Sequence, residues 1–179
     1  MTMIRLPRRG LLALGAAAGV AGCGFRPVYM PTASGKPGPA QRELAAITVN
    51  IIPERPGQLL RQALQERLAA GASGVEHRYN LAVSFYIVGE ALGIQQDTVA
   101  TYVRLIGRAS WTLIAQDPAN THLTTGNTRV LDSFNVLDQQ YFASDLENEA
   151  VQRRMAETTA EQIALQLGVF FRKRAEAMG

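Results

Sequence analysis

The feature that most constrains this chain is its single cysteine, Cys23, which follows a short segment without any acidic residue. Three arginines lie among the first nine residues, and residues 11–22 are small or apolar and uncharged. A basic stretch followed by a short apolar run is typical of a secretory signal. The apolar run is too short to cross a bilayer core, which needs about 20 residues. We therefore predict that residues 1–22 direct export and that the folded protein follows them.

The residues around Cys23 indicate lipid attachment. Val20-Ala21-Gly22-Cys23 resembles a bacterial lipobox, in which a branched apolar residue and two small residues precede a thiol that receives a thioether-linked lipid. The alternative is a soluble exported protein with an incidental cysteine. Because the thiol lies where cleavage is expected and has no second cysteine to pair with, we predict a lipoprotein signal peptide over residues 1–22 and lipidation of Cys23. The attached lipid would hold the protein on a membrane.

Removal of the signal makes the protein electrically neutral. The chain carries 18 Lys and Arg against 15 Asp and Glu, and three of the arginines but none of the acids precede Cys23. The 157 residues from Cys23 onward therefore carry equal numbers of basic and acidic side chains. This balance removes the argument for a nucleic-acid partner that overall basicity would give. The length suits one domain with a sizeable core.

We interpret residues 23–46 as a lipidated N-terminus with a tether, and residues 47–179 as a single α+β domain. Residues 30–41 are rich in proline and glycine, which is typical of a flexible or extended linker. Phe25, Val28 and Tyr29 differ, because a tether has no local reason to expose large apolar side chains. They either dock on the domain or bind a partner, and the sequence favours neither.

Hydrophobic periodicity predicts a strand and then a helix at the start of the domain. β-Branched residues over 47–52 indicate a short strand. Leu60, Leu64 and Leu68 recur at a spacing of four, which predicts an amphipathic helix over 59–70 whose leucine stripe enters the core.

The period then changes to two. Alternation predicts a strand of about ten residues from Tyr79, and two more strands over about 98–115 and 123–135, with a turn at 117–120. Three such strands in series are expected to be antiparallel, with one buried and one solvated face. The pattern Ser144-Asp145-Leu146-Glu147 is a capping box that predicts the start of a long C-terminal helix. The element order is therefore β-α-β-β-β-α.

Three arginines are expected on the solvated face of this sheet. Arg104 and Arg108 are four residues apart, and a turn centred near Ala119 places Arg129 opposite Arg108. Like charges that face each other destabilise a sheet unless each finds an acid or an anion lies between them. A lipid phosphate suits this role, because the planar guanidinium matches phosphate geometry. The alternative is that Asp132 or solvent satisfies the arginines.

Motifs for catalysis are absent from the sequence. It contains no phosphate-cradling glycine loop, no zinc-protease motif and no serine-hydrolase motif. His77 and His122 lie far apart in sequence and have no cysteines to complete a metal site. We therefore expect no enzyme activity, no cofactor and no bound metal.

A family resemblance begins at the lipidation site. Cys23-Gly24-Phe25-Arg26-Pro27-Val28-Tyr29 resembles the Cys-Gly-Phe-x-Pro-aliphatic-Tyr opening of LptE, the lipoprotein family of lipopolysaccharide transport. The domain resembles this family more diffusely, through Leu60-Arg61, Gly107-Arg108-Ala109 and Ser133-Phe134-Asn135. The opening motif is the most specific part of the match.

The resemblance implies a two-layer α+β sandwich, with a mainly antiparallel four-stranded sheet packed on two helices. It implies a protein that plugs the outer-membrane β-barrel LptD, helps to assemble it and contacts lipopolysaccharide. Gly24 directly after the lipidated cysteine implies the outer membrane, with the domain on the periplasmic side. Arg104, Arg108 and Arg129 are candidate lipopolysaccharide-binding residues on strand geometry, and they are not taken from a family motif.

A second function remains open. Another periplasm-facing lipoprotein, acting as a lipid carrier or as a pilot or scaffold for a different outer-membrane complex, would share the anchor and a similar small domain. An apolar groove for an acyl chain would favour the carrier, whereas a flat polar surface would favour the plug.

Overall fold

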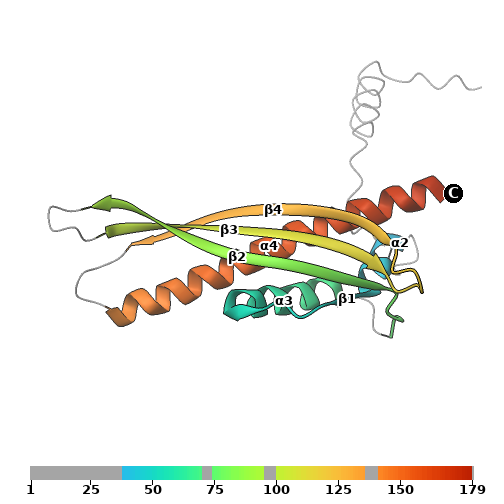
Figure 1. The fold of residues 1–179 in the computed structure, drawn as a ribbon, viewed down its shortest axis with the longest axis horizontal. Coiled ribbons are helices and arrows are strands. Elements are labelled where there is room, and N and C mark those ends of the chain that lie inside the picture. Colours follow the sequence, from blue (N-terminus) through green and yellow to red (C-terminus); the bar gives the residue numbers. More distant parts are fainter. Residues whose placement is uncertain (1–37, 70–73, 95–99, 136–140, 179) are drawn as a thin grey trace, which may run out of the picture.

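The computed structural model describes residues 38–69, 74–94, 100–135 and 141–178. Within these ranges the chain forms three helices and four strands (Figure 1). Their order is α2 (Pro39–Ala45), β1 (Ile47–Val49), α3 (Glu54–Ala69), β2 (Tyr79–Ile94), β3 (Ala100–Ala115), β4 (His122–Asn135) and α4 (Tyr141–Met178). The predicted α+β class and the order of its strands and two main helices are confirmed.

The four strands form one sheet in the order β1-β2-β3-β4. β3 is antiparallel to both β2 and β4, whereas β1 runs parallel to β2 from Ile47↔Tyr79 to Val49↔Leu81. In the turn between β3 and β4, the Asp117 carboxylate accepts hydrogen bonds from the hydroxyl and the backbone N–H of Thr121, at 2.6 and 2.8 Å. These two bonds lower the pKa of Asp117 from its ordinary value. The predicted mainly antiparallel sheet and the turn at 117–120 are therefore confirmed.

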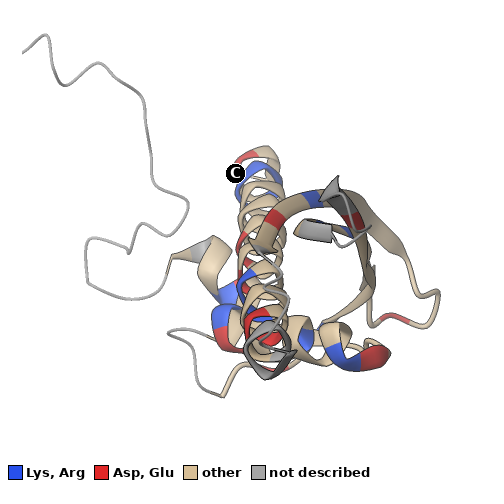
Figure 2. Ribbon diagram, turned by 90° about the vertical axis from the view of Figure 1, so that its left-hand side faces the viewer, with Lys and Arg blue, Asp and Glu red and all other residues tan. Residues whose placement is uncertain are grey.

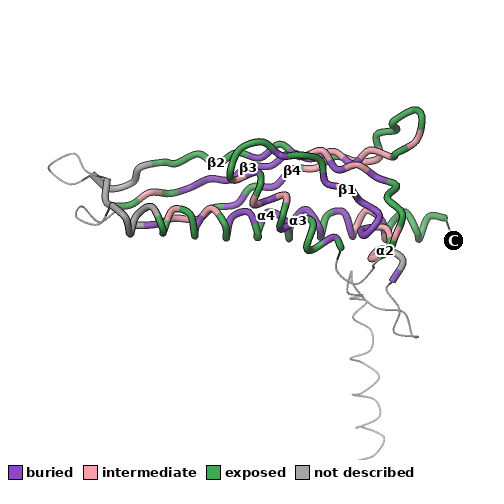
Figure 3. The backbone as a smooth tube through the Cα atoms, turned by 90° about the horizontal axis from the view of Figure 1, so that it is seen from below, coloured by how far each residue is buried: buried purple, intermediate pink, exposed green. Residues whose placement is uncertain are grey.

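The domain has two layers, with the core between them. Viewed along its long axis, the sheet curves over α3 and α4, which lie on its concave side (Figure 2). Leu60, Leu64 and Leu68 of α3 are at most 3% exposed, which confirms that the leucine stripe enters the core. Buried residues lie along the sides of the helices and strands that face each other (Figure 3).

Helix α2 lies in the segment that the sequence analysis assigned to the tether. Gly38 precedes it in an extended conformation, and Pro39 occupies its first turn, where a missing N–H leaves no hydrogen bond unmade. Leu44 and Ala46 are 1% and 0% exposed and pack in the same core as α3 and the sheet. The described structure therefore already contains a helix that starts eight residues ahead of Ile47, because these apolar side chains gain burial that the Pro- and Gly-rich composition does not reveal.

Two further element boundaries differ from the sequence-based expectations. β2 continues past Val88 to Ile94, because β3 still pairs with Gly89 and Glu90 where the apolar alternation of β2 stops. The capping-box prediction is wrong, since α4 begins at Tyr141 and Ser144 already lies inside the helix. An N-cap residue has non-helical backbone angles, and Ser144 does not occupy that position.

Candidate ligand site on the outer face of the sheet

Strands β2, β3 and β4 turn one face to the helices and the other to solvent. The face toward the helices, the inner face, carries Leu81, Val83, Trp111 and Leu113, none of them more than 9% exposed. The intervening residues make up the outer face and align in rows across the three strands. Three such rows are Ser84–Ser110–Asn127, Tyr86–Arg108–Arg129 and Val88–Ile106–Leu131, of which we call the second the arginine row.

Arg108 and Arg129 are direct neighbours across β3 and β4. They are Cα partners in the sheet register, as the sequence predicts, so their Cα atoms are about 4.5–5.5 Å apart and their side chains leave the same face. Both side chains are exposed. Tyr86 of β2 lies opposite Arg108 and is 48% exposed, which gives the row an aromatic end.

The arginine row lacks acidic partners. No hydrogen bond or ion pair is found for Arg108 or Arg129 within the described part of the chain. Asp132, the acid considered as their partner, instead binds Arg154 of α4, with Oδ2 3.1 Å from Nη2 and 3.2 Å from Nε. The Asp132 alternative is therefore wrong, because this side chain belongs to the inner face and joins β4 to α4. Two positive charges remain side by side in solvent, which favours an anion between them.

Arg104 shares the outer face but not the arginine row. It lies two rows away, between Glu90 of β2 and Ser133 of β4, and is exposed. No ion pair to Arg104 is found among the described residues. The acid in the neighbouring strand nevertheless reduces the positive potential around Arg104. The structure thus brings Arg108 and Arg129 together and leaves Arg104 beside them as a separate charge.

The rows on either side of the arginine row differ in chemistry. On one side, hydroxyl and amide side chains line a hollow of about 580 Å³. A second hollow of about 450 Å³, which shares Ser110 and Asn127 with the first, is lined by the arginine row itself. On the other side, Val88 and Leu131 are 47% and 59% exposed, although both are aliphatic. These flanking rows were not predicted from the sequence. The available signal was the presence of apolar residues at positions of β2 and β4 that should face solvent.

Cys23 and the opening motif lie outside the described residues, so the lipidation site keeps the status of a prediction. In the part of the chain that the structure describes, no helix combines the length and apolar character that crossing a membrane requires. The same part contains no group of three or more His, Cys, Asp or Glu side chains arranged to hold a metal ion.

The fold is similar to solved structures of bacterial lipoproteins. A putative lipoprotein from Caulobacter crescentus is 26% identical to this chain, with a TM-score of 0.62 over 76% of this chain and 98% of that one. Rare lipoprotein B from Shewanella oneidensis is 13% identical, with a TM-score of 0.50 over 73% and 98%. A minor lipoprotein from Acinetobacter baumannii is 16% identical, with a TM-score of 0.50 over 69% and 90%. The last two comparisons show a shared fold. No curated protein sequence matches the chain.

A family comparison covers most of the described domain. Residues 44–167 match the LptE family, which is described as lipopolysaccharide-assembly. The matched range contains α3, the whole sheet with its arginine row and most of α4, and it exceeds half of the chain. The chain therefore belongs to the LptE lipopolysaccharide-assembly family.

Proposed function

We propose that this protein is an outer-membrane lipoprotein that plugs an LptD-type β-barrel, supports its assembly and binds lipopolysaccharide on the outer face of its sheet. The observation that carries the proposal is the Arg108–Arg129 pair, which faces solvent without an acidic partner in a chain of the LptE family. The role is binding rather than catalysis, in keeping with a non-enzymatic lipoprotein family.

The outer face matches the chemistry of lipid A, the membrane-embedded part of lipopolysaccharide. Lipid A joins phosphate groups, sugar hydroxyls and acyl chains in one molecule. The arginine row offers charge-assisted hydrogen bonds to a phosphate. The neighbouring hollows offer the hydroxyl and amide groups of Ser110, Thr125 and Asn127 to a sugar. Val88 and Leu131, on the far side of the arginines, offer exposed apolar surface to an acyl chain.

The plug role rests on the family and on the character of the surface. The lumen of an outer-membrane barrel is polar, and the outer face of this sheet carries hydroxyl, amide and guanidinium groups in adjacent rows. An N-terminal lipid at Cys23 would hold the domain at the outer membrane on the periplasmic side. The lipid-carrier alternative calls for an apolar groove. The hollows on the outer face are lined mainly by polar side chains, and the pocket lined by Phe171, Ala175 and Met178 shares no residue with them.

Copurification tests the proposal. The full-length protein, with a C-terminal affinity tag, is extracted from its membranes in mild detergent, and the eluate is analysed by mass spectrometry and for lipopolysaccharide. We expect a large β-barrel protein in a one-to-one ratio, together with lipopolysaccharide. Recovery of lipid without a barrel would favour the carrier, and recovery of neither would contradict the proposal.

Two double variants test whether lipopolysaccharide binding depends on the arginine row or on net charge alone. Arg108→Glu with Arg129→Glu reverses the arginine row, whereas Arg153→Glu with Lys173→Glu makes the same change in net charge on the exposed side of α4. We expect the first pair to reduce bound lipopolysaccharide at least tenfold and the second pair to leave it unchanged. Equal loss in both variants would show a response to net charge rather than a site.

A further inference from the structure

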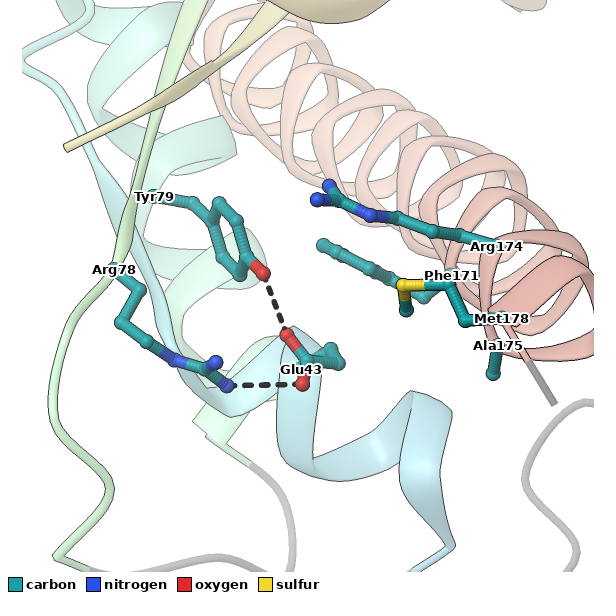
Figure 4. Close-up of a pocket in the computed structure, with 7 residues that line it drawn as sticks. All are labelled: Glu43, Arg78, Tyr79, Phe171, Arg174, Ala175 and Met178. Carbon is teal, nitrogen blue, oxygen red and sulfur yellow. Dashed lines mark hydrogen bonds and ion pairs between the residues drawn. The ribbon is translucent and has the colours of Figure 1, made fainter. Parts of the chain in front are cut away.

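A pocket of about 430 Å³ lies at the end of the domain where α2 begins and α4 ends (Figure 4). We call it the terminal pocket. Tyr79 and Phe171 form its aromatic wall, with ring centroids 5.2 Å apart. Ala175 and Met178 of α4 complete the apolar lining, and Met178 is 75% exposed. Tyr79 and Phe171 are only 8% and 2% exposed, so the apolar surface that the pocket leaves open to solvent is mainly that of Ala175 and Met178.

The polar residues at the rim restrict what enters. Glu43 of α2 is already engaged, because its carboxylate accepts hydrogen bonds from the Tyr79 hydroxyl at 2.7 Å and from Arg78 Nη2 at 2.9 Å. Both carboxylate oxygens are therefore occupied, so the pocket offers no free acid to a cationic guest. Arg174 is the remaining charged group and lies over the aromatic wall (Figure 4). This combination suits an aromatic or aliphatic side chain, accompanied by a hydroxyl or carbonyl oxygen that accepts from arginine.

A segment of the same chain carries side chains of this kind and lies close to the pocket in sequence. Glu43 of the pocket belongs to α2, whose first residue is Pro39, so the preceding segment enters the domain beside the pocket. Tyr29 is ten residues before Pro39, and ten residues span up to about 35 Å when extended. Phe25, Val28 and Tyr29 are the large apolar residues of this segment next to Cys23. A tether of this length raises their local concentration at the pocket to about millimolar.

We propose that residues 25–29 dock in the terminal pocket, with Phe25 or Tyr29 against Phe171 and Met178. The sequence leaves open whether Phe25, Val28 and Tyr29 contact the domain or a partner protein. In this proposal they contact the domain. It also fixes the orientation of the domain, because a lipid on Cys23 would then lie within a few residues of the pocket. The end of α4 that carries Arg172, Lys173 and Arg174 would face the membrane, and the opposite end of the sheet, where β2 ends and β3 begins, would point away from it (Figure 1).

Photo-crosslinking in intact cells tests this docking. p-Benzoyl-phenylalanine replaces Tyr29 in one strain and Phe25 in another, in the otherwise unchanged full-length protein. After irradiation, mass spectrometry identifies the crosslinked partner. We expect an intramolecular crosslink to Phe171, Ala175 or Met178 from at least one position. Crosslinks to another protein or to phospholipid from both positions, or no crosslink from either, would overturn the proposal.

A matched pair of variants on α4 checks that the crosslink reports the pocket. Ala175 lines the pocket and is exposed, so Ala175→Glu places a carboxylate at its mouth without disturbing the core. Ala177→Glu adds the same charge two residues further along the helix, away from the pocket lining. We expect Ala175→Glu to reduce the crosslink yield at least tenfold and Ala177→Glu to preserve it, with equal melting temperatures. An unchanged yield in Ala175→Glu would contradict docking at this site.

Discussion

The two faces of the sheet are made from the same three strands, yet only one of them is explained by folding. The inner face buries Leu81, Trp111 and Leu113 against α3 and α4. The outer face leaves Arg108 and Arg129 opposed and unpaired beside exposed aliphatic residues. Packing accounts for the first arrangement, whereas the second costs free energy in the isolated domain. This like-charged, exposed arrangement is the observation on which the proposed ligand site rests.

Ion pairs sharpen the contrast between the helical side and the outer face. Arg55, Arg67, Arg78 and Arg154 each lie within 3.7 Å of a carboxylate, and none of these pairs involves the outer face. In these four pairs, Glu149 and Glu161 of α4 join it to α3, Asp132 joins β4 to α4, and Glu43 joins α2 to the residue before β2. The arginine row receives none of them.

The largest difference between the faces is expected when a side chain is truncated. Leu113→Ala on the inner face removes a fully buried side chain and should lower the free energy of unfolding by about 2–5 kcal/mol. Thr112→Ala, the adjacent residue on the outer face, should change it by about 0.5 kcal/mol or less. Denaturant unfolding of both variants measures these values. Similar losses in the two would remove the distinction between the faces.

Close packing on the inner face predicts a smaller effect at a glycine. A Cβ at Gly126 would overlap Cζ2 of Trp111, whose Nε1 donates to Gln166 Oε1 at 3.1 Å. Gly126→Ala should therefore cost about 1–3 kcal/mol by displacing the indole ring. Gly89→Ala is the control, since the nearest atom to its Cβ is 3.4 Å away. Equal stability of the two variants would mean that the Trp111 contact is not tight.

The outer face predicts a gain in stability instead of a loss. Arg108→Glu replaces a like-charge pair with an opposite-charge pair across β3 and β4. The free energy of unfolding should rise by about 0.2–1 kcal/mol in low salt, and the gain should shrink as salt screens it. A loss of more than 1 kcal/mol would indicate that Arg108 has a structural role.

The smallest expected effect concerns Tyr79, whose titratable side chain lies on the inner face and also lines the terminal pocket. Burial, and then the hydrogen bond to Glu43, raise the pKa of Tyr79, so the folded state favours the protonated phenol. Its contribution to stability is complete below the unfolded pKa of about 10 and is lost as pH rises through the higher folded pKa. The difference in unfolding free energy between wild type and Tyr79→Phe should therefore shrink above about pH 10. A difference independent of pH would contradict this assignment.

The sequence predicted those features whose signal is local and periodic. The spacing of Leu60, Leu64 and Leu68 predicted α3, and alternation predicted the three long strands. The turn at 117–120 fixed the register, so the pairing of Arg108 with Arg129 could be predicted before the structure was known. That register is the main part of the candidate site.

Other features depended on tertiary contacts that a linear pattern does not show. Helix α2 is only seven residues long, and its burial of Leu44 was hidden behind a Pro- and Gly-rich segment. The end of β2 is held by pairing with β3 rather than by its own pattern. The apolar row beside the arginines was missed because exposed Val88 and Leu131 depart from strict alternation.

Under the proposed function, the arginine row recognises phosphate on lipid A. The affinity of the purified protein for bisphosphorylated lipid A, compared with its affinity for the same lipid without phosphates, measures this recognition. The wild type should bind the phosphorylated form at least tenfold more tightly, and the Arg108→Glu, Arg129→Glu variant should bind both forms equally. If the variant keeps the wild-type preference for the phosphorylated lipid, the account of the outer face is wrong.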